Sequence, residues 1–256
     1  MIRTDLNILV RKLQTDILPG EDAIQWGIRV TESLIDRFPR RLPFLRSTAF
    51  NDYVSAISDL LDSSIDSTKH SEITKIMNQV SKHPDSIVIG QFSANEMIDY
   101  YRFLNSDFNL LTRNNIIECL NIYEKLCAIF EKDLALAYCL LKLKETRFSF
   151  DYTSVPRGAR GNQTVNQYCL KRLPVFRRSY NDNMRNSTAH FNIETRDTPQ
   201  ILIAHPLNEG VDKQLPYEQV LTICREMAAL VLAFRLFSVI LAIADWKVVG
   251  AVLHVK

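Results

Sequence analysis

The stretch LTRNNIIECLNIYEKLCAIFEKDLALAYCLLKLKETRF, residues 111–148, is a long helical pattern. Its apolar residues recur three or four positions apart, the spacing that places side chains on one face of an α-helix. A second long pattern, residues 217–249, is apolar on nearly all sides. Such a helix is typical of the centre of a bundle or of a dimer interface. The two patterns predict an all-α protein, built as a helical bundle.

Shorter helical patterns lie on both sides of the first long one. They cover residues 2–18, 21–38, 49–65, 72–80, 93–104 and 162–173, and a further helix that begins at Pro174 and includes Phe191. The chain has only 7 Gly and 9 Pro in 256 residues, which favours long helices over a many-turned β architecture.

Two features modify this helical outline. β-branched and aliphatic residues flank Asp197-Thr198-Pro199, so residues 191–206 can form a short hairpin. We expect a domain boundary near residue 106. It separates a helical N-terminal region of unknown role, residues 1–106, from a helical domain, residues 107–256.

The middle of the second long pattern raises the question of a membrane span. Residues 227–244 are apolar except for Arg235 and Ser238, and they are nearly long enough to cross a bilayer. An arginine at the centre of a span costs about 2.5–3.5 kcal/mol on insertion scales. We therefore favour a buried helix, with no membrane partner, over a membrane span.

The cysteines and the first residues favour a cytoplasmic protein. The five cysteines are odd in number and show neither a C-x-x-C pair nor the spacing of zinc ligands. Reduced cysteines are the simple interpretation, and we expect no metal site and no cofactor. The opening residues MIRTDLN lack the apolar run of a secretory signal.

Residues 184–191, MRNSTAHF, concentrate chemistry more than any other stretch. Arg185 is a permanent cation, Asn186 a hydrogen-bonding amide, and His190 titrates near neutral pH. On a helix Asn186 and His190 share a face, and the long side chain of Arg185 can bend toward them. RNA cleavage without a metal needs a base for the 2′-hydroxyl, an acid for the leaving oxygen and a cation for the phosphorane. One copy supplies one imidazole here, so a two-fold dimer would bring two to one cleft.

The segment RNSTAH, residues 185–190, resembles the R-x4-H signature of HEPN-domain proteins, in which a polar residue follows the Arg. The resemblance covers roughly residues 107–250. It implies a small helical bundle, a homodimer with a composite cleft, and metal-independent RNA cleavage that leaves 2′,3′-cyclic phosphate ends. It also implies that Arg185 and His190 are the catalytic pair and that Asn186 orients them.

The same resemblance suggests a biological setting. Many HEPN proteins are toxins or effectors in antiviral defence and stress response, which implies RNA and a regulatory protein or antitoxin as partners. Toxins paired with a nucleotidyltransferase antitoxin often carry a Tyr two residues after the His. Asn192 occupies that position here, so we do not expect that form of control.

The charge distribution gives separate support for a polyanion partner. Residues 142–178 contain nine basic and two acidic residues, whereas the whole chain has a net charge of only +2. Tyr152 and Tyr168 offer rings on which bases could stack. A solvated helix face with a flexible basic loop is the alternative interpretation. The candidate RNA-binding residues are Arg157, Arg160, Lys171, Arg172, Arg177 and Arg178.

Two functions remain open from the sequence. The leading hypothesis is a metal-independent endoribonuclease with Arg185, Asn186 and His190 at a composite dimer site. The alternative is a non-catalytic helical module for dimerisation or for binding a nucleotide or RNA. His205, after the hairpin, could also approach such a site.

Overall fold

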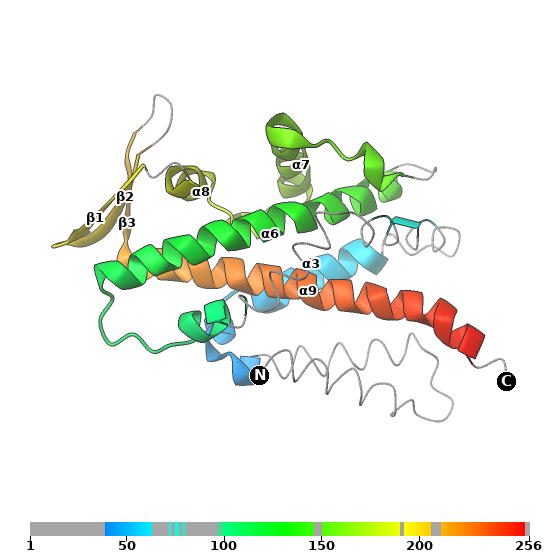
Figure 1. The fold of residues 1–256 in the computed structure, drawn as a ribbon, viewed down its shortest axis with the longest axis horizontal. Coiled ribbons are helices and arrows are strands. Elements are labelled where there is room, and N and C mark those ends of the chain that lie inside the picture. The colour runs from blue at the N-terminus through cyan, green and yellow to red at the C-terminus, as the bar shows by residue number, and fades with distance from the viewer. Residues whose placement is uncertain are drawn as a thin grey trace.

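The computed structural model describes residues 39–62, 72, 75–76, 79, 97, 99–145, 150–189, 192–205 and 211–253. Two long helices, α6 (Arg113–Glu145) and α9 (Tyr217–Leu253), lie side by side and form its centre (Figure 1). Both run from the end that carries the β-sheet toward the opposite end (Figure 1). The two long helices predicted from the sequence are therefore confirmed.

An aromatic cluster fills the space between the two long helices and their neighbours. The ring of Phe176 contacts Phe234, Phe130 and Tyr53 at centroid distances of 5.4, 6.1 and 6.2 Å. All four rings are almost completely buried. Tyr53 belongs to α3 (Phe50–Asp62), so the cluster joins this helix to α6 and α9. Each edge-to-face pair contributes about 0.5–1.5 kcal/mol beyond its buried area.

Residues from the N-terminal side join the same core through α9. The Glu226 carboxylate accepts a hydrogen bond from the Tyr53 hydroxyl at 2.7 Å. Nε of Arg225 donates to the carbonyl oxygen of Leu104 at 2.9 Å. Buried residues before and after residue 106 form one continuous cluster. The domain boundary near residue 106 stays a prediction.

A three-stranded antiparallel sheet lies at one end of the helices, in the order β1-β2-β3 (Figure 1). β1 (Ile193–Asp197) and β2 (Gln200–Ala204) form the hairpin that the sequence allowed. β3 (Lys213–Pro216) pairs with β2 and was not predicted, because its four residues lead directly into the helical pattern of α9. The structure is mostly helical, which agrees in outline with the all-α prediction, and it adds this small sheet.

The helix predicted to begin at Pro174 and include Phe191 is interrupted in the structure. Its residues form a 3-10 helix, η3 (Pro174–Arg178), and a separate helix, α8 (Asp182–Ala189). Phe191 lies outside the described residues. The prediction of one continuous helix is wrong because a buried tyrosine from α6 holds the chain open between the two pieces.

That tyrosine is Tyr123. Its hydroxyl donates to the carbonyl oxygen of Ser179 at 3.1 Å and accepts from the backbone N–H of Asn181 at 2.8 Å. The side-chain oxygen of Asn181 accepts from the backbone N–H of Met184 at 3.0 Å, which is the geometry of a helix N-cap. The start of α8, the helix that carries Arg185 and Asn186, is therefore fixed from α6.

Helix α7 (Gly158–Arg172) begins four residues before the helix predicted at residues 162–173. Gly158 has φ of +73°, a conformation that favours glycine. A Cβ at Gly161 would lie 2.5 Å from the carbonyl carbon of Pro156. The two glycines let the helix begin directly against the Pro156 backbone, where the sequence indicated a break.

Other expectations have mixed outcomes. The helices predicted at residues 2–18 and 21–38 lie outside the described residues. None of the five cysteines forms a disulfide, as the sequence predicted, and the structure adds that all five are buried. The side chains of α9 are described as far as Arg235. Within the described residues, no helix is long and apolar enough to span a membrane.

Candidate functional site

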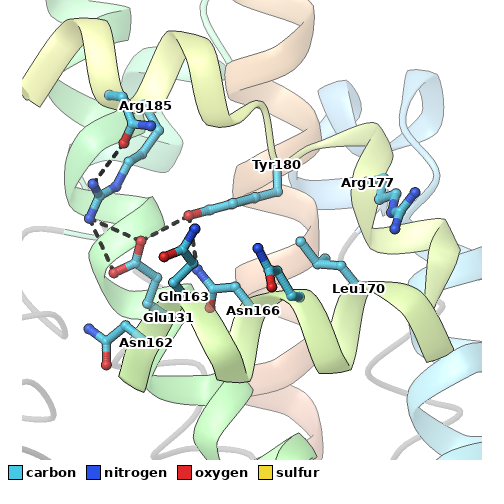
Figure 2. Close-up of a pocket in the computed structure, with 10 residues that line it drawn as sticks. Glu131, Asn162, Gln163, Asn166, Leu170, Arg177, Tyr180 and Arg185 are labelled. Carbon is cyan, nitrogen blue, oxygen red and sulfur yellow. Dashed lines mark hydrogen bonds and ion pairs between the residues drawn. The ribbon is translucent and has the colours of Figure 1, made fainter. Parts of the chain in front are cut away.

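A cleft of about 680 Å³ opens between α6, α7 and α8 and contains Arg185 and Asn186 of the motif (Figure 2). Helix α8 supplies these two residues, and α6 supplies Glu131. Tyr180 enters from the break before α8, and α7 forms the remaining wall. Arg185 and Asn186 therefore line an open cleft, whereas Thr188 of the same helix is buried.

A chain of hydrogen bonds crosses the cleft from α7 to α8 (Figure 2). Nδ2 of Asn166 donates to the Tyr180 hydroxyl at 3.1 Å, and that hydroxyl donates to Glu131 at 2.9 Å. The guanidinium of Arg185 lies 3.1 Å from the Glu131 carboxylate. The same guanidinium donates to the side-chain oxygen of Asn186 at 3.0 Å. One network thus fixes both motif residues.

The register of α8 turns Arg185 and Asn186 toward the cleft. Met184 and Thr188, four residues apart on one face, are buried. The Thr188 hydroxyl donates to the carbonyl oxygen of Met184 at 2.7 Å. Because this face is held against the core, the residues that follow Met184 project to the side that faces α7.

Glu131 offsets the charge of Arg185. The Arg185 side chain is 33% exposed and that of Glu131 is 10% exposed, so the arginine is the more accessible of the two to solvent. Arg177 is a second cation in the lining. The three ionised groups leave the cleft with a net charge of +1. Guanidinium N–H groups are suited to carboxylate and phosphate oxygens, so the cleft can hold one anionic group.

The basic residues predicted to bind RNA divide into three groups. Arg177 lines the cleft together with the motif. Arg172 pairs with Glu145 at 2.7 Å, and Arg178 pairs with Asp52 at 2.8 Å. These two arginines are therefore partly neutralised within the protein.

The third group comprises Arg157, Arg160 and Lys171. They are exposed on or next to α7, outside the cleft. The Arg157 guanidinium lies 5.5 Å from the centre of the Tyr152 ring. The structure thus brings one of the six basic residues into the site and leaves these three on the surface beside it.

The two tyrosines expected to stack bases are engaged inside the protein. Tyr152 is buried. The Tyr168 ring has the Arg172 guanidinium 3.5 Å and the Lys142 ammonium 4.2 Å from its centre. Intramolecular cation–π contacts of this kind stabilise the folded surface. They occupy the Tyr168 ring, which the sequence suggested as a stacking platform for a base.

Of the two candidate histidines, His190 and His205, the structure describes only His205. His190 lies outside the described residues, one position after the end of α8. His205 follows β2, and its Nδ1 lies 2.9 Å from an Asp212 carboxylate oxygen. His205 does not line the cleft.

Sequence reasoning missed most of the cleft. Glu131 gave no signal, because it is one acidic residue on a long amphipathic helix, 54 positions before Arg185. α7 did carry a signal in its spacing. Four carboxamides recur at i, i+1, i+4 and i+5, which places them on one helical face. They are Asn162, Gln163, Asn166 and Gln167.

No protein-family model, no curated protein and no solved structure matches this chain. Within the described ranges, no three His, Cys, Asp or Glu side chains lie together in a way that could hold a metal ion. The function is therefore argued from the motif and from the cleft around it.

Proposed function

We propose that this protein is a metal-independent endoribonuclease of HEPN type that acts as a homodimer. One observation carries the proposal. Arg185 of the R-x4-H motif lies in an open polar cleft, held by Glu131 and next to Asn186 of the same motif. Arg185 and Asn186 share this cleft with a second cation, Arg177, an arrangement that suits an anionic substrate.

In this proposal Arg185 binds the scissile phosphate. A planar guanidinium can present two N–H groups to the non-bridging oxygens and stabilise the charge of the phosphorane. Glu131 and Asn186 hold the guanidinium in place, because Nη2 of Arg185 pairs with the Glu131 carboxylate and Nη1 donates to the side-chain oxygen of Asn186. Neither residue has to touch the RNA for this role.

His190 supplies the proton transfers. It takes the proton of the 2′-hydroxyl while the 2′-oxygen attacks phosphorus and the bond from phosphorus to the 5′-oxygen breaks. The departing 5′-oxygen takes a proton from the same histidine of the second copy. The products are a 2′,3′-cyclic phosphate and a 5′-hydroxyl, so atoms and protons balance without water or metal.

The homodimer follows from this chemistry. One copy offers one imidazole from the motif, while the reaction needs both a base and an acid. A two-fold axis through the motif would supply both. We further propose that the protein works in the cytoplasm as a toxin or effector in defence or stress response, under the control of a regulatory protein or antitoxin.

The direct test is RNA cleavage in the presence of EDTA by the wild-type chain and by single variants. We expect cleavage by the wild type and a loss of at least about 100-fold in His190→Ala and Arg185→Ala, since a positioned acid–base group contributes about 10²–10⁴-fold. Arg196→Ala is the matched control, because Arg196 is an exposed arginine paired with Glu194 on β1. Wild-type protein that cleaves no RNA, or a His190→Ala variant as active as the wild type, would reject the proposal.

The Arg185–Glu131 ion pair supports a second candidate function. In it, Arg185 ties α8 to α6, and the protein is a non-catalytic helical module for dimerisation or for binding a nucleotide or RNA. This candidate predicts that Arg185→Ala lowers thermal stability or changes the oligomeric state while RNA stays intact with every variant, the wild type included.

A further inference from the structure

The face of α7 that borders the cleft is lined by carboxamides. Asn162, Gln163, Asn166 and Gln167 are followed one turn later by Leu170, and all five line the cleft. Within the described part of the chain, the side chains of Asn162, Gln163 and Gln167 make no hydrogen bond. Three of these amides are exposed and Asn166 is half-buried, and together the four form one continuous polar wall of the cleft.

Asn166 shows that this surface is not satisfied by the protein alone. Its Nδ2 is used by the Tyr180 hydroxyl, while its Oδ1 is buried and has no hydrogen-bond partner among the described residues. A buried acceptor without a donor is costly. A donor group of a ligand, reached by a small rotation of the amide, would relieve that cost.

The carboxamide face lies between two cations. Figure 2 shows Arg185 at one end of the cleft and Arg177 at the other, with the side chains of α7 between them. A ligand that fits this order carries a flat polar group with donors and acceptors in the middle and a negative charge at an end. A nucleotide has this order, and a cleft of about 680 Å³ is large enough for one.

We propose that the carboxamide face of α7 holds one unpaired nucleobase of single-stranded RNA, next to the phosphate bound by Arg185. A carboxamide presents one acceptor and two donors in a plane, and so pairs with the edge of a base. Bases are open to such contacts when they are unstacked in a single strand. Leu170 provides an apolar contact for the ring. This inference rests on the proposed function, since it assigns the substrate of the same site.

The test is binding of fluorescein-labelled octaribonucleotides to the His190→Ala protein, which keeps the RNA intact during the measurement. Homopolymers of A, C and U are compared with an octamer that has the same backbone and abasic sugars. We expect at least one homopolymer to bind about tenfold more tightly than the abasic strand, the discrimination that one good amide–base pair provides.

Variants then locate the effect. In Gln163→Ala/Gln167→Ala, both exposed on α7, the homopolymers should bind only as well as the abasic strand, whose own affinity stays unchanged. The matched control is Asn51→Ala/Gln219→Ala, which removes exposed amides from α3 and α9 and should keep the tenfold difference. Thermal unfolding checks that both double variants are folded.

Three outcomes overturn the inference: equal affinity for base-containing and abasic strands, no binding of any strand, and a base preference that survives in Gln163→Ala/Gln167→Ala. Competition with the nucleoside monophosphates separates the two sources of the same chemistry. If a monophosphate binds as tightly as the best octamer, the ligand is a free nucleotide and not RNA. If the wild-type chain prefers strands with bases but cleaves no RNA, the proposed nuclease function is refuted and this inference is not. If the chain cleaves RNA but binds strands with and without bases equally, this inference is refuted and the nuclease function is not.

Discussion

Arg185 is held against a carboxylate of another helix, and this contact links the stability of the protein to its proposed activity. Nη2 of Arg185 lies 3.1 Å and 3.3 Å from the two oxygens of Glu131. The carboxylate limits how strongly the arginine attracts RNA and also fixes where the guanidinium points. Removing the charge of Glu131 should therefore affect binding and stability in opposite directions.

Glu131→Gln tests this residue. The variant keeps an acceptor for the Tyr180 hydroxyl but raises the charge of the cleft by one. We expect tighter RNA binding and a steeper loss of affinity with salt, by up to about 0.7 in the log–log slope for a single strand. We also expect a loss of about 1–2 kcal/mol in the free energy of unfolding, because Arg185 loses its partner while solvent still screens its exposed side.

Fluorescence anisotropy at several salt concentrations and urea unfolding measure the two effects. Glu194→Gln is the control, since Glu194 forms an exposed pair with Arg196 away from the cleft. RNA affinity that falls in Glu131→Gln would contradict the assignment of Arg185 to phosphate.

Among the elements, α8 depends on α6 for its start. The Tyr123 hydroxyl bridges Ser179 and Asn181 in the gap between η3 and α8. Without this hydroxyl, the buried carbonyl oxygen of Ser179 and the partly buried N–H of Asn181 both lose a hydrogen-bond partner. The start of the helix that carries Arg185 and Asn186 is therefore set by a residue more than sixty positions away from Arg185 in the sequence.

Tyr123→Phe should lower the free energy of unfolding by about 1–3 kcal/mol, the cost of leaving buried polar groups unpaired. Urea unfolding gives the value. Tyr138→Phe is the control, because Tyr138 lies on the same helix and its hydroxyl has no hydrogen-bond partner among the described residues. Equal stability of the two variants would show that the bridge does not hold the break.

The contact between α6 and α9 contains a titrating group. Burial raises the pKa of Asp133 from 3.8 to about 6, and Arg235, 3.6 Å away, lowers it only in part. Between these two values the folded protein binds a proton that the unfolded chain does not bind. The free energy of unfolding therefore falls as pH rises through this window, and the cost of the buried charge is complete above the folded pKa.

Asp133→Asn should remove this fall. We expect the wild type to lose about 1–3 kcal/mol relative to the variant between pH 4 and pH 7, as followed by urea unfolding at each pH. Asp107→Asn, an exposed substitution, should follow the wild-type curve. Parallel curves for the wild type and Asp133→Asn would contradict the raised pKa.

At the scale of the whole molecule, the sequence predicted what periodicity encodes. Long runs of spaced apolar residues predicted α6 and α9, and the odd number and spacing of the cysteines predicted that they form no disulfides. Features set by tertiary contacts were missed. The break before α8 depends on Tyr123 from α6, and the start of α7 depends on how Gly161 meets Pro156.

The same limit applies to the site. Local spacing identified Arg185, Asn186 and His190. The first two line the cleft, and His190 lies outside the described residues. Glu131 and Tyr180 join them only because distant segments meet in space. The six basic residues were chosen by charge alone. Charged side chains on the surface also pair with one another, and Arg172 and Arg178 form ion pairs with Glu145 and Asp52 instead of lining the cleft.

The most direct test of the central claim is the chemical identity of the RNA ends that the wild-type chain produces in EDTA. Mass spectrometry of a cleaved oligoribonucleotide distinguishes them. Attack by the 2′-oxygen under His190 and Arg185 predicts a 2′,3′-cyclic phosphate on one fragment and a 5′-hydroxyl on the other. A 3′-hydroxyl with a 5′-phosphate, or RNA that remains intact, would contradict the account.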